Sequence, residues 1–499
     1  MKMKFKTVGI IACVVVLLVG ILDWQTLFGA DEKKRYHQHM EAPKKESCTA
    51  AHTDGELCTH LPLISIETGG VQIPGGGIKD ENGRHIGFVT APDGSDRITA
   101  HMDVMDNEQK YNHPSDTPAV SSNIVIHARG NSSRFFDKLG YRIKLVDEDG
   151  NNNPQSLMGM DAHHEWALHG PYLDKTLMRN YMWYNISGEI MGYAPNVRFC
   201  ELVINGEYQG VYVLTEMIGA GEDGARLDLS VDVKDNTYTG YLLRLDRYDN
   251  NLDDWMRSLT TYTLRNDMEL KLEVEFPGEK KLTSELKKSI KEDFSAFEKA
   301  LYSYDYDNKK YGYTNFIDVD SFAEYLLIHE FVVNYDAGSL STYIYKDTSG
   351  KFKMCVWDFN NACDNYQEQS MMTVQHFQLQ HKLWFGMLMK DEDFIERIIS
   401  RYRELRKTYL SEEYLNDYID DVIEYLGPAI DRNFEKWGYS FDDTTLLEPE
   451  ERNIHSYDEA VTQLKWFFEK CGNWRDVNIE LFRKYSDESK IKRYNEVCD

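Results

Sequence analysis

The sequence predicts a two-lobed α+β fold whose first half is rich in β-strands and whose second half is helical. Two observations lead to this expectation. Short runs of alternating apolar and polar residues, separated by glycine-containing turns, dominate residues 61–247, as expected for strands with one buried face. From residue 282 onward, apolar residues recur mainly at helical spacing, which predicts amphipathic helices packed on a core. We therefore expect a β-rich lobe at 61–247 and a mainly helical lobe at 248–499.

The N-terminus precedes these lobes with a membrane-type segment. Lys2, Lys4 and Lys6 come before an uninterrupted apolar run at 8–22, the pattern of a signal anchor or a signal peptide. Phe28-Gly29-Ala30 is a poor cleavage site, which favours an uncleaved anchor at 1–30 with the body exported to the outside of the cell membrane. Cleavage would instead give a secreted protein. Residues 31–60 are polar and predict a linker.

The composition of the chain limits the classes of molecule that it is expected to bind. The chain has 56 Lys and Arg against 83 Asp and Glu, a net charge of −27, which repels nucleic acid and favours basic partners. No cysteine and histidine spacing of the zinc-binding type and no internal repeat is present. In an exported body, Cys48 and Cys58 are the best disulfide candidates, because they lie close together in a polar segment.

The first candidate binding feature lies between two predicted strands, at 123–129 and 141–145. Period two places Arg142 and Lys144 on one face of the second strand, opposite its apolar residues. A glycine turn with hydroxyls, followed by a strand with two cations, suits an anion, because backbone N–H groups in such a turn form a nest. The alternative is a plain hairpin with two solvated cations. The residues of this feature are Arg129, Gly130, Asn131, Ser132, Ser133, Arg142 and Lys144.

The next elements follow in order. A helix is expected at 174–191, with Asp174 as its N-cap. Strands at 199–204 and 211–214 flank an Asn-Gly turn, a strong hairpin signal, and Glu216 ends the second strand. Another strand is expected at 240–246 and a strand-rich insertion at 250–277. Helices follow at 282–301 and 319–334, and the last of these leads to Asp336.

Asp336 and Asp358 flank a predicted hairpin with strands at 341–346 and 351–357. The turn between them, Asp-Thr-Ser-Gly, has the residues that a hairpin turn requires. Because a hairpin returns the chain to its start, we expect both carboxylates at one end of the ribbon. One carboxylate can then orient or deprotonate a hydroxyl while the other binds a divalent metal on a nucleotide. The alternatives are a surface hairpin with an Asp at each end, or the carboxylate pair of a glycosidase.

Several segments together resemble the CotH kinase family of spore-coat and secreted proteins. They extend in the family's order from about residue 61 to the C-terminus. The segments are Arg-Gly-Asn-Ser-Ser at 129–133, Tyr-Arg-Ile-Lys-Leu at 141–145, Asp174 with Arg179-Asn180, Ile-Asn-Gly-Glu-Tyr at 204–208 with Gly-Val-Tyr at 210–212, Gly-Tyr-Leu-Leu at 240–243, Asn334 with Asp336, and Trp-Asp-Phe at 357–359.

The resemblance implies an atypical protein-kinase-like fold that transfers phosphate from ATP, with Mg²⁺ or Mn²⁺, to serine or threonine of partner coat or surface proteins. It implies Asp336 as the catalytic acid, Asp358 as a metal ligand and Lys144 as a phosphate contact. Gly130 to Ser133, with Arg129, Arg142 and Glu216, would bind the nucleotide. For a second metal the sequence leaves two alternatives: Asn365 or Asp364 supplies the ligand, or the second metal lacks a strong ligand. A spore-surface location follows if the N-terminal segment is cleaved, and the acidic charge favours a basic, serine-containing substrate.

The chain departs from typical kinases at several positions. Ser341 stands five residues after Asp336, where kinases have Asn, no His-Arg-Asp triplet precedes Asp336, and Asn360 replaces the glycine after Asp358-Phe359. Glu189 is available as the helix acid for Lys144. The alternative function is a non-catalytic exported protein that uses the same fold for adhesion or coat assembly.

Overall fold

The computed structural model describes residues 35–47, 56–219, 227, 229, 239–247, 257–267, 269–368 and 374–486. The chain separates into two compact units, Met1–His37 and Gln38–Asp499, and the description below concerns the second. The predicted anchor at 1–30 and Cys48 of the predicted disulfide lie outside the described residues, so both stay predictions. No helix within the described ranges combines the length and apolar character that crossing a membrane requires.

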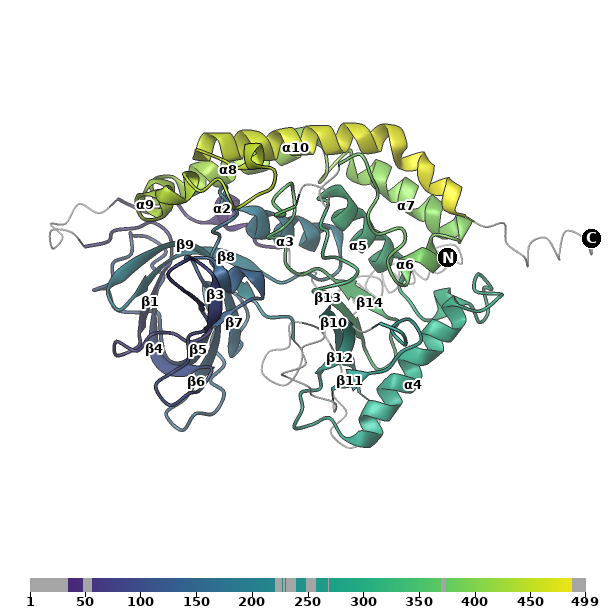
Figure 1. Ribbon diagram of the computed structural model, residues 1–499, viewed down its shortest axis with the longest axis horizontal. Helices are drawn as coiled ribbons and strands as arrows, with labels where there is room; N and C mark the ends of the chain where they lie inside the picture. Colours follow the sequence, from purple (N-terminus) through teal and green to yellow (C-terminus); the bar gives the residue numbers. More distant parts are fainter. Residues whose placement is uncertain are drawn as a thin grey trace, which may run out of the picture. The chain divides into compact units, whose positions relative to one another are not determined.

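A closed β-barrel forms the first part of this unit (Figure 1). Neighbouring strands are antiparallel except for β1 and β8, which pair in parallel. Small barrels of this kind are filled by their own inward side chains, and here the interior is an apolar cluster that includes Ile126, Ile143, Trp166 and Leu214. In barrel order the strands are β1 (Leu63–Glu67), β4 (Ile98–Met105), β5 (Val120–Arg129), β6 (Gly140–Val146), β7 (Glu165–His169), β9 (Glu207–Glu216) and β8 (Val197–Ile204).

Strand β6 confirms the period-two prediction. Tyr141, Ile143 and Leu145 are buried in the barrel, while Arg142 and Lys144 lie on its outer face. Alternation decides this arrangement because successive side chains of a strand point to opposite faces. Arg142 and Lys144 are therefore side by side on the outer face of the barrel.

A second sheet has five strands, in the order β11 (Ser258–Leu259), β12 (Leu270–Phe276), β10 (Tyr241–Arg247), β13 (Thr342–Lys346) and β14 (Lys353–Cys355). The predicted hairpin is confirmed as β13 and β14, which pair through Tyr343 and Cys355, and Asp347 accepts the turn hydrogen bond from Gly350 N–H. Strand β10, predicted as part of the first lobe, lies instead in this second sheet. It pairs on both sides with strands from the second half of the chain, and sequence periodicity carries no information about partners so distant.

Helices make up most of the regular structure in the second half of the chain, so the predicted mixed α+β composition is confirmed. Helix α3 is buried almost all round, which explains why its sequence has little polar face, and α10 extends across the top of the ribbon in Figure 1. The helices are α2 (Gln38–Glu41), α3 (Arg179–Ile190), α4 (Ser284–Leu301), α5 (Val319–Phe331), α6 (Phe385–Leu388), α7 (Glu392–Leu405), α8 (Glu412–Leu426), α9 (Pro428–Trp437) and α10 (Tyr457–Asn478).

Helix α3 begins at Arg179 and not at Asp174, so the predicted N-cap position is wrong. Leu177, with φ of 66°, breaks the helical path between the two residues. The Asp174 carboxylate nevertheless accepts hydrogen bonds from the N–H groups of Thr176 and Arg179. Asp174 therefore accepts a hydrogen bond from the first residue of the helix although a short loop separates the two in sequence. Sequence patterns do not reveal this loop.

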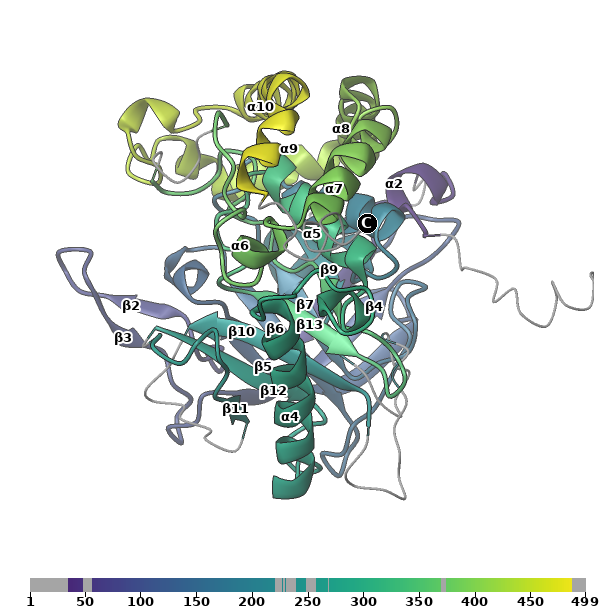
Figure 2. The ribbon, with the colours of Figure 1, turned by 90° about the vertical axis from the view of Figure 1, so that its right-hand side faces the viewer.

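The connection from β5 to β6 is a loop of residues 130–139 rather than a tight hairpin turn. It contains a short 3₁₀ helix, η1 (Ser132–Phe135). A two-stranded hairpin, β2 (Gly77–Lys79) and β3 (His85–Phe88), projects to one side in Figure 2. The ring of Phe135 stacks on Phe88, with ring centres 5.4 Å apart, so this hairpin supports the loop.

Candidate active site

Asp336 and Asp358 meet at one end of the β13–β14 hairpin, as predicted. Asp336 follows α5, and Asp358 follows β14 with a φ of 60°. Asn334 joins the two segments, because its Nδ2 donates to the Asp358 carbonyl oxygen at 2.9 Å. The Asp358 N–H donates to the hydroxyl of Tyr184 on α3 at 3.0 Å. The backbone of Asp358 is therefore fixed from two sides.

Both carboxyl groups hold their protons more tightly than free aspartate. Burial raises the pKa of Asp336 above 3.8, although a hydrogen bond from Asn361 Nδ2, at 2.9 Å, opposes the rise. Burial also raises the pKa of Asp358, Arg129 lowers it, and the charge of Asp336 raises it further. Like charges in a desolvated place disfavour ionisation, so the two acids form an interacting pair, and Asp246 at the end of β10 adds to the negative potential on both.

Cations from three elements surround this pair. Arg129, the last residue of β5, acts on Asp358, and its guanidinium lies 5.3 Å from the ring centre of Trp357. Arg247 and Lys382 act on Asp336. The Lys382 Nζ donates to the carbonyl oxygens of Tyr335 and Ala337, and burial lowers the pKa of Lys382 to about 8. Each carboxylate of the pair therefore has at least one cation that favours its ionised form.

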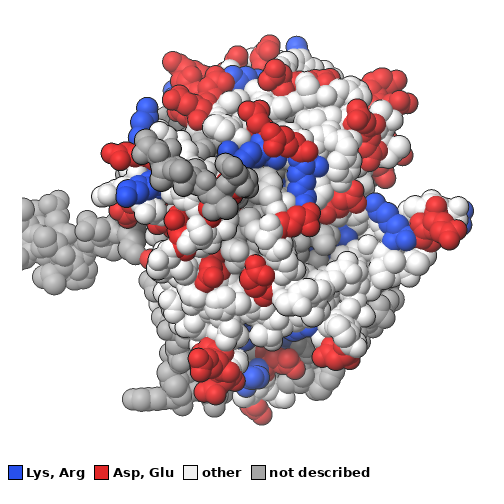
Figure 3. All heavy atoms as spheres, turned by 90° about the vertical axis from the view of Figure 1, so that its left-hand side faces the viewer, with Lys and Arg blue, Asp and Glu red and all other residues white. Residues whose placement is uncertain are grey.

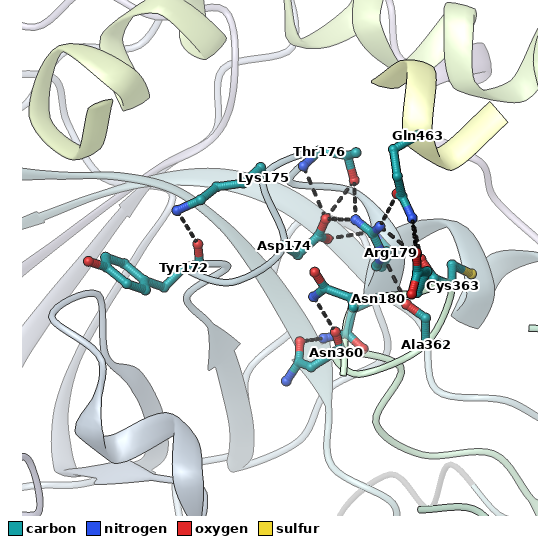
Figure 4. A network of polar contacts seen from close by, with 12 residues as sticks. Tyr172, Asp174, Lys175, Thr176, Arg179, Asn180, Asn360, Ala362, Cys363 and Gln463 are labelled. Atoms are coloured by element: carbon teal, nitrogen blue, oxygen red, sulfur yellow. Dashed lines mark hydrogen bonds and ion pairs between the residues drawn. The ribbon is translucent and has the colours of Figure 1, made fainter. Parts of the chain in front are cut away.

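The start of α3 clamps the loop that follows Asp358 (Figure 4). The Asn180 side chain accepts from the Phe359 N–H at 2.8 Å and donates to the Asn360 side chain at 2.5 Å. The Arg179 guanidinium donates to the carbonyl oxygens of Ala362 and Cys363, each at 3.0 Å. Arg179 is itself held by an ion pair with Asp174 at 2.5 Å. These bonds fix a loop in which Cys363 and Asp364 also have positive φ.

The Gly130–Ser133 segment lies directly after Arg129. Gly130 has a φ of 110°, and a Cβ placed there would meet the Ser133 hydroxyl oxygen at 1.8 Å, so only glycine fits. The Ser133 hydroxyl donates to the Arg129 carbonyl oxygen. Gly130, Asn131 and Ser132 are exposed and directly follow Arg129, the residue that acts on Asp358.

The other predicted cations of the nucleotide site, Arg142 and Lys144, lie on β6, the strand next to that of Arg129. Arg142 is one strand over from Arg129 on the outer barrel face and pairs with Glu165 at 2.6 Å. Lys144 lies two residues further along β6, in register with Glu165. Arg129, rather than Lys144, is therefore the barrel cation that acts on Asp358.

Glu216 and Asn365 are held by contacts within the fold. Glu216 accepts from the backbone and side-chain nitrogens of Asn196 and lies opposite Trp166 in the barrel. The Asn365 amide donates to the Asn360 carbonyl oxygen at 2.7 Å, and Asp364 pairs with Arg452 at 2.9 Å. The contacts of these side chains support the loop and the barrel end rather than joining the acidic pair.

The sequence prediction missed Asp246, Arg247, Asn361 and Lys382. Asn361 follows the Trp-Asp-Phe segment within a few residues, so the pair of asparagines there was a usable signal. Asp246 and Arg247 reach the site because β10 pairs with β13, and Lys382 arrives from a segment with no local pattern. Long-range strand pairing, which sequence does not display, brings these residues in.

Comparison with known proteins now identifies the family. The model of the CotH kinase protein family matches residues 126–475. The chain belongs to the CotH kinase family. The match begins within β5 and contains Arg129, Asp336 and Asp358. The chain is also similar to the inner spore coat protein H of Bacillus subtilis (strain 168), with 24% identity over 321 residues, which covers 63% of this chain and 76% of that protein.

The contacts of Arg179 with Asp174 and with the loop after Asp358, here called the clamp, predict a large loss of stability for a conservative change in this CotH family member. Arg179→Lys removes the planar fork that serves two carbonyl oxygens and leaves Asp174 poorly paired, so the free energy of unfolding should fall by about 3 kcal/mol. Arg397→Lys is the matched control, because Arg397 forms an exposed pair with Asp320 and should cost about 0.5 kcal/mol. Urea unfolding measures both, and equal losses would contradict the clamp.

The raised pKa values of the acidic pair predict how stability depends on pH. The folded chain holds these protons to higher pH than the unfolded chain, whose aspartates titrate near 3.8. The free energy of unfolding therefore falls as pH rises from about 4 through the raised pKa values. Without metal, Asp358→Asn should raise the melting temperature at pH 7, by on the order of 2 °C, and the gain should shrink toward pH 4. A variant that melts lower at pH 7 would contradict the repulsion between the acids.

Proposed function

We propose that the protein is a metal- and ATP-dependent protein serine/threonine kinase. The observation that carries this proposal is the pair of interacting carboxylates, Asp336 and Asp358, on one hairpin beside Arg129 at the end of a barrel strand. Phosphoryl transfer needs a group to orient the attacking hydroxyl, a ligand for the metal and cations for the phosphates. Membership of the CotH kinase family supports the same reaction.

The residues present fit a metal that arrives with the nucleotide. No group of three or more His, Cys, Asp or Glu suited to a metal ion occurs among the described residues. Mg²⁺ is commonly held by one or two carboxylates together with phosphate oxygens, and Asp358 provides such a carboxylate. Asn334 adds a buried amide oxygen that has no hydrogen-bond partner in the described part of the chain, next to Asp358. When bound, Mg²⁺ or Mn²⁺ would neutralise the charge of the transferring phosphate.

Asp336 is the residue we assign to the substrate hydroxyl. Its raised pKa makes its carboxylate a stronger base than free aspartate, and Asn361 fixes its orientation through Oδ2. The Asp336 carboxylate would accept the serine or threonine proton as the hydroxyl oxygen bonds to the γ-phosphorus, while the bond from that phosphorus to the β,γ-bridging oxygen breaks and ADP leaves. Arg129 would hold phosphate oxygens near Asp358, with Gly130, Asn131 and Ser132 presenting backbone N–H groups.

The acidic character of the chain guides the substrate proposal. Acidic side chains are spread over the face in Figure 3, with smaller groups of Lys and Arg between them, in agreement with the net charge of −27. We propose a basic, serine-containing protein as substrate, because opposite charge speeds association. The similarity to a spore coat protein supports a spore-surface location, and a location at the cell membrane through the N-terminal segment stays a prediction.

Replacement of either acid should separate their roles. Asp336→Asn should lower the rate of phosphate transfer by about 10³-fold, with ATP binding retained, since a general base contributes about 10²- to 10⁴-fold. Asp358→Asn should abolish metal-dependent ATP binding as well as transfer. Labelled ATP, Mn²⁺ and a basic serine-rich protein provide the assay, and Asp320→Asn, at an exposed ion pair in the first turn of α5, is the control. Transfer that survives both site substitutions would refute the assignment.

A coat-assembly protein without catalysis is the second candidate, and the similarity to the inner spore coat protein H of Bacillus subtilis favours it. The effect of ATP on the melting temperature distinguishes the kinase from the assembly protein. The kinase should melt at a higher temperature with ATP and Mn²⁺ than with either alone, because a ligand that binds the folded state stabilises it. No change at millimolar ATP would favour the assembly protein.

A further inference from the structure

His169 is a buried histidine at the end of β7 to which neither the family match nor the proposed mechanism gives a role. Its side chain is 6% exposed. Its ring lies 6.0 Å from that of Trp357 and 6.3 Å from that of Tyr184, centre to centre. Trp357 precedes Asp358, and Tyr184 accepts from the Asp358 N–H. His169 therefore contacts the residues on either side of the predicted metal ligand.

His169 also contacts Arg129. The Nη1 atom of Arg129 lies 3.4 Å from Nε2 of His169, a long contact. A guanidinium only donates, so Nε2 must be the unprotonated nitrogen of a neutral ring. Burial, together with the charge of Arg129, holds the pKa of His169 well below 6.5, so the ring is neutral at physiological pH. The histidine can thus act as a lasting acceptor for the arginine.

Gly140 lies on the strand between Arg129 and His169. Gly140 is the register partner of Arg129 on the neighbouring strand β6, and β6 lies between β5 and β7 in the barrel. A Cβ at Gly140 would lie 3.9 Å from the Arg129 Cγ and 3.1 Å from the Leu168 carbonyl oxygen. The Arg129 side chain therefore lies over Gly140 of β6 on its way to His169 on β7.

Arg129 is therefore held in one orientation on the outer face of the barrel. Trp357 lies against its guanidinium, His169 accepts from one nitrogen, and Asp358 supplies the opposing charge. An arginine in solution has many rotamers, and fixing it beforehand lowers the entropy lost when a ligand binds. A planar guanidinium fixed in this way suits bidentate contact with phosphate oxygens.

We propose that His169 is a positioning residue that aims Arg129 at the phosphate chain of a nucleoside triphosphate next to Asp358. This inference rests on the proposed kinase function, in which Arg129 holds phosphate oxygens, and extends it by assigning to the buried histidine the task of orienting Arg129. A purely structural histidine would leave ATP and AMP equally affected by its loss.

The test is a double-mutant cycle on the full-length chain, with dissociation constants for ATP and AMP measured by calorimetry in Mn²⁺. His169→Phe keeps an aromatic ring between Trp357 and Tyr184 but removes the acceptor, and should weaken ATP binding about 10-fold, the range of one hydrogen bond to a charged group. Arg129→Ala should weaken ATP binding by more. The double variant should bind ATP no more weakly than Arg129→Ala alone, because His169 acts through Arg129.

Three comparisons complete the design. AMP, which lacks the β- and γ-phosphates, should bind His169→Phe within about 2-fold of the unaltered chain, a difference too small to involve a lost charged hydrogen bond. His169→Gln, which supplies an oxygen acceptor, should recover most of the ATP affinity. His101→Phe is the matched control, since His101 lies on β4 and contacts Ser121 and Asn123, and it should bind ATP normally.

The outcomes that overturn the inference are distinct from those that overturn the kinase proposal. Losses in the double variant that multiply, or an equal loss of AMP binding in His169→Phe, would make His169 a structural residue while leaving ATP binding by the protein established. An unaltered chain that binds no ATP would overturn both. If His169→Phe melts below the assay temperature, His169→Met takes its place in the cycle, with the same expected result.

Discussion

The arrangement on which the structure depends is the unfavourable pairing of Asp336 with Asp358 in a largely desolvated place. Burial and mutual repulsion both raise the cost of ionising these groups. The surroundings offset that cost only in part, through Arg129 on one acid and Asn361, Arg247 and Lys382 on the other. A chain selected for stability alone would separate the two carboxylates. Sites that keep such strain are commonly functional, and a bound metal and phosphate would relieve it.

The scaffold holds the pair in place by using backbone contacts rather than more charge. The β13–β14 hairpin sets the separation of the two segments, and Asn334 ties the Asp358 carbonyl to the end of α5. Arg179 and Asn180, at the start of α3, hold the loop after Asp358 (Figure 4). Because α3 is buried between the barrel and the helical half, both parts of the fold help to position the Asp358 carboxylate. Arg129 and His169, which belong to barrel strands, lie next to the same residue.

The parts of the fold and of the candidate site that depend on local sequence patterns could be predicted from the sequence. The turn residues and β-rich runs around Gly350 define the hairpin, and the alternation around Ile143 places Arg142 and Lys144 on one face. Asp174 is a case in which local patterns place the helix start wrongly, because an extra loop with Leu177 at positive φ separates Asp174 from the helix. The choice between Arg129 and Lys144 depends on how the barrel faces the second sheet, which no strand pattern encodes. Lys382 and Asp246 arrive by tertiary pairing alone, and the predicted roles of Glu216 and Asn365 stay predictions.

The most direct measurement of the central claim is anomalous diffraction from crystals grown with Mn²⁺ and a non-hydrolysable ATP analogue. The account predicts a manganese peak bound by the Asp358 carboxylate at about 2.1 Å, as for hard divalent cations on oxygen. It also predicts Arg129 on a phosphate oxygen and Asp336 facing the γ-phosphate. A peak elsewhere, for example at Asp364, with Asp336 and Asp358 both remote from the nucleotide, would contradict the account.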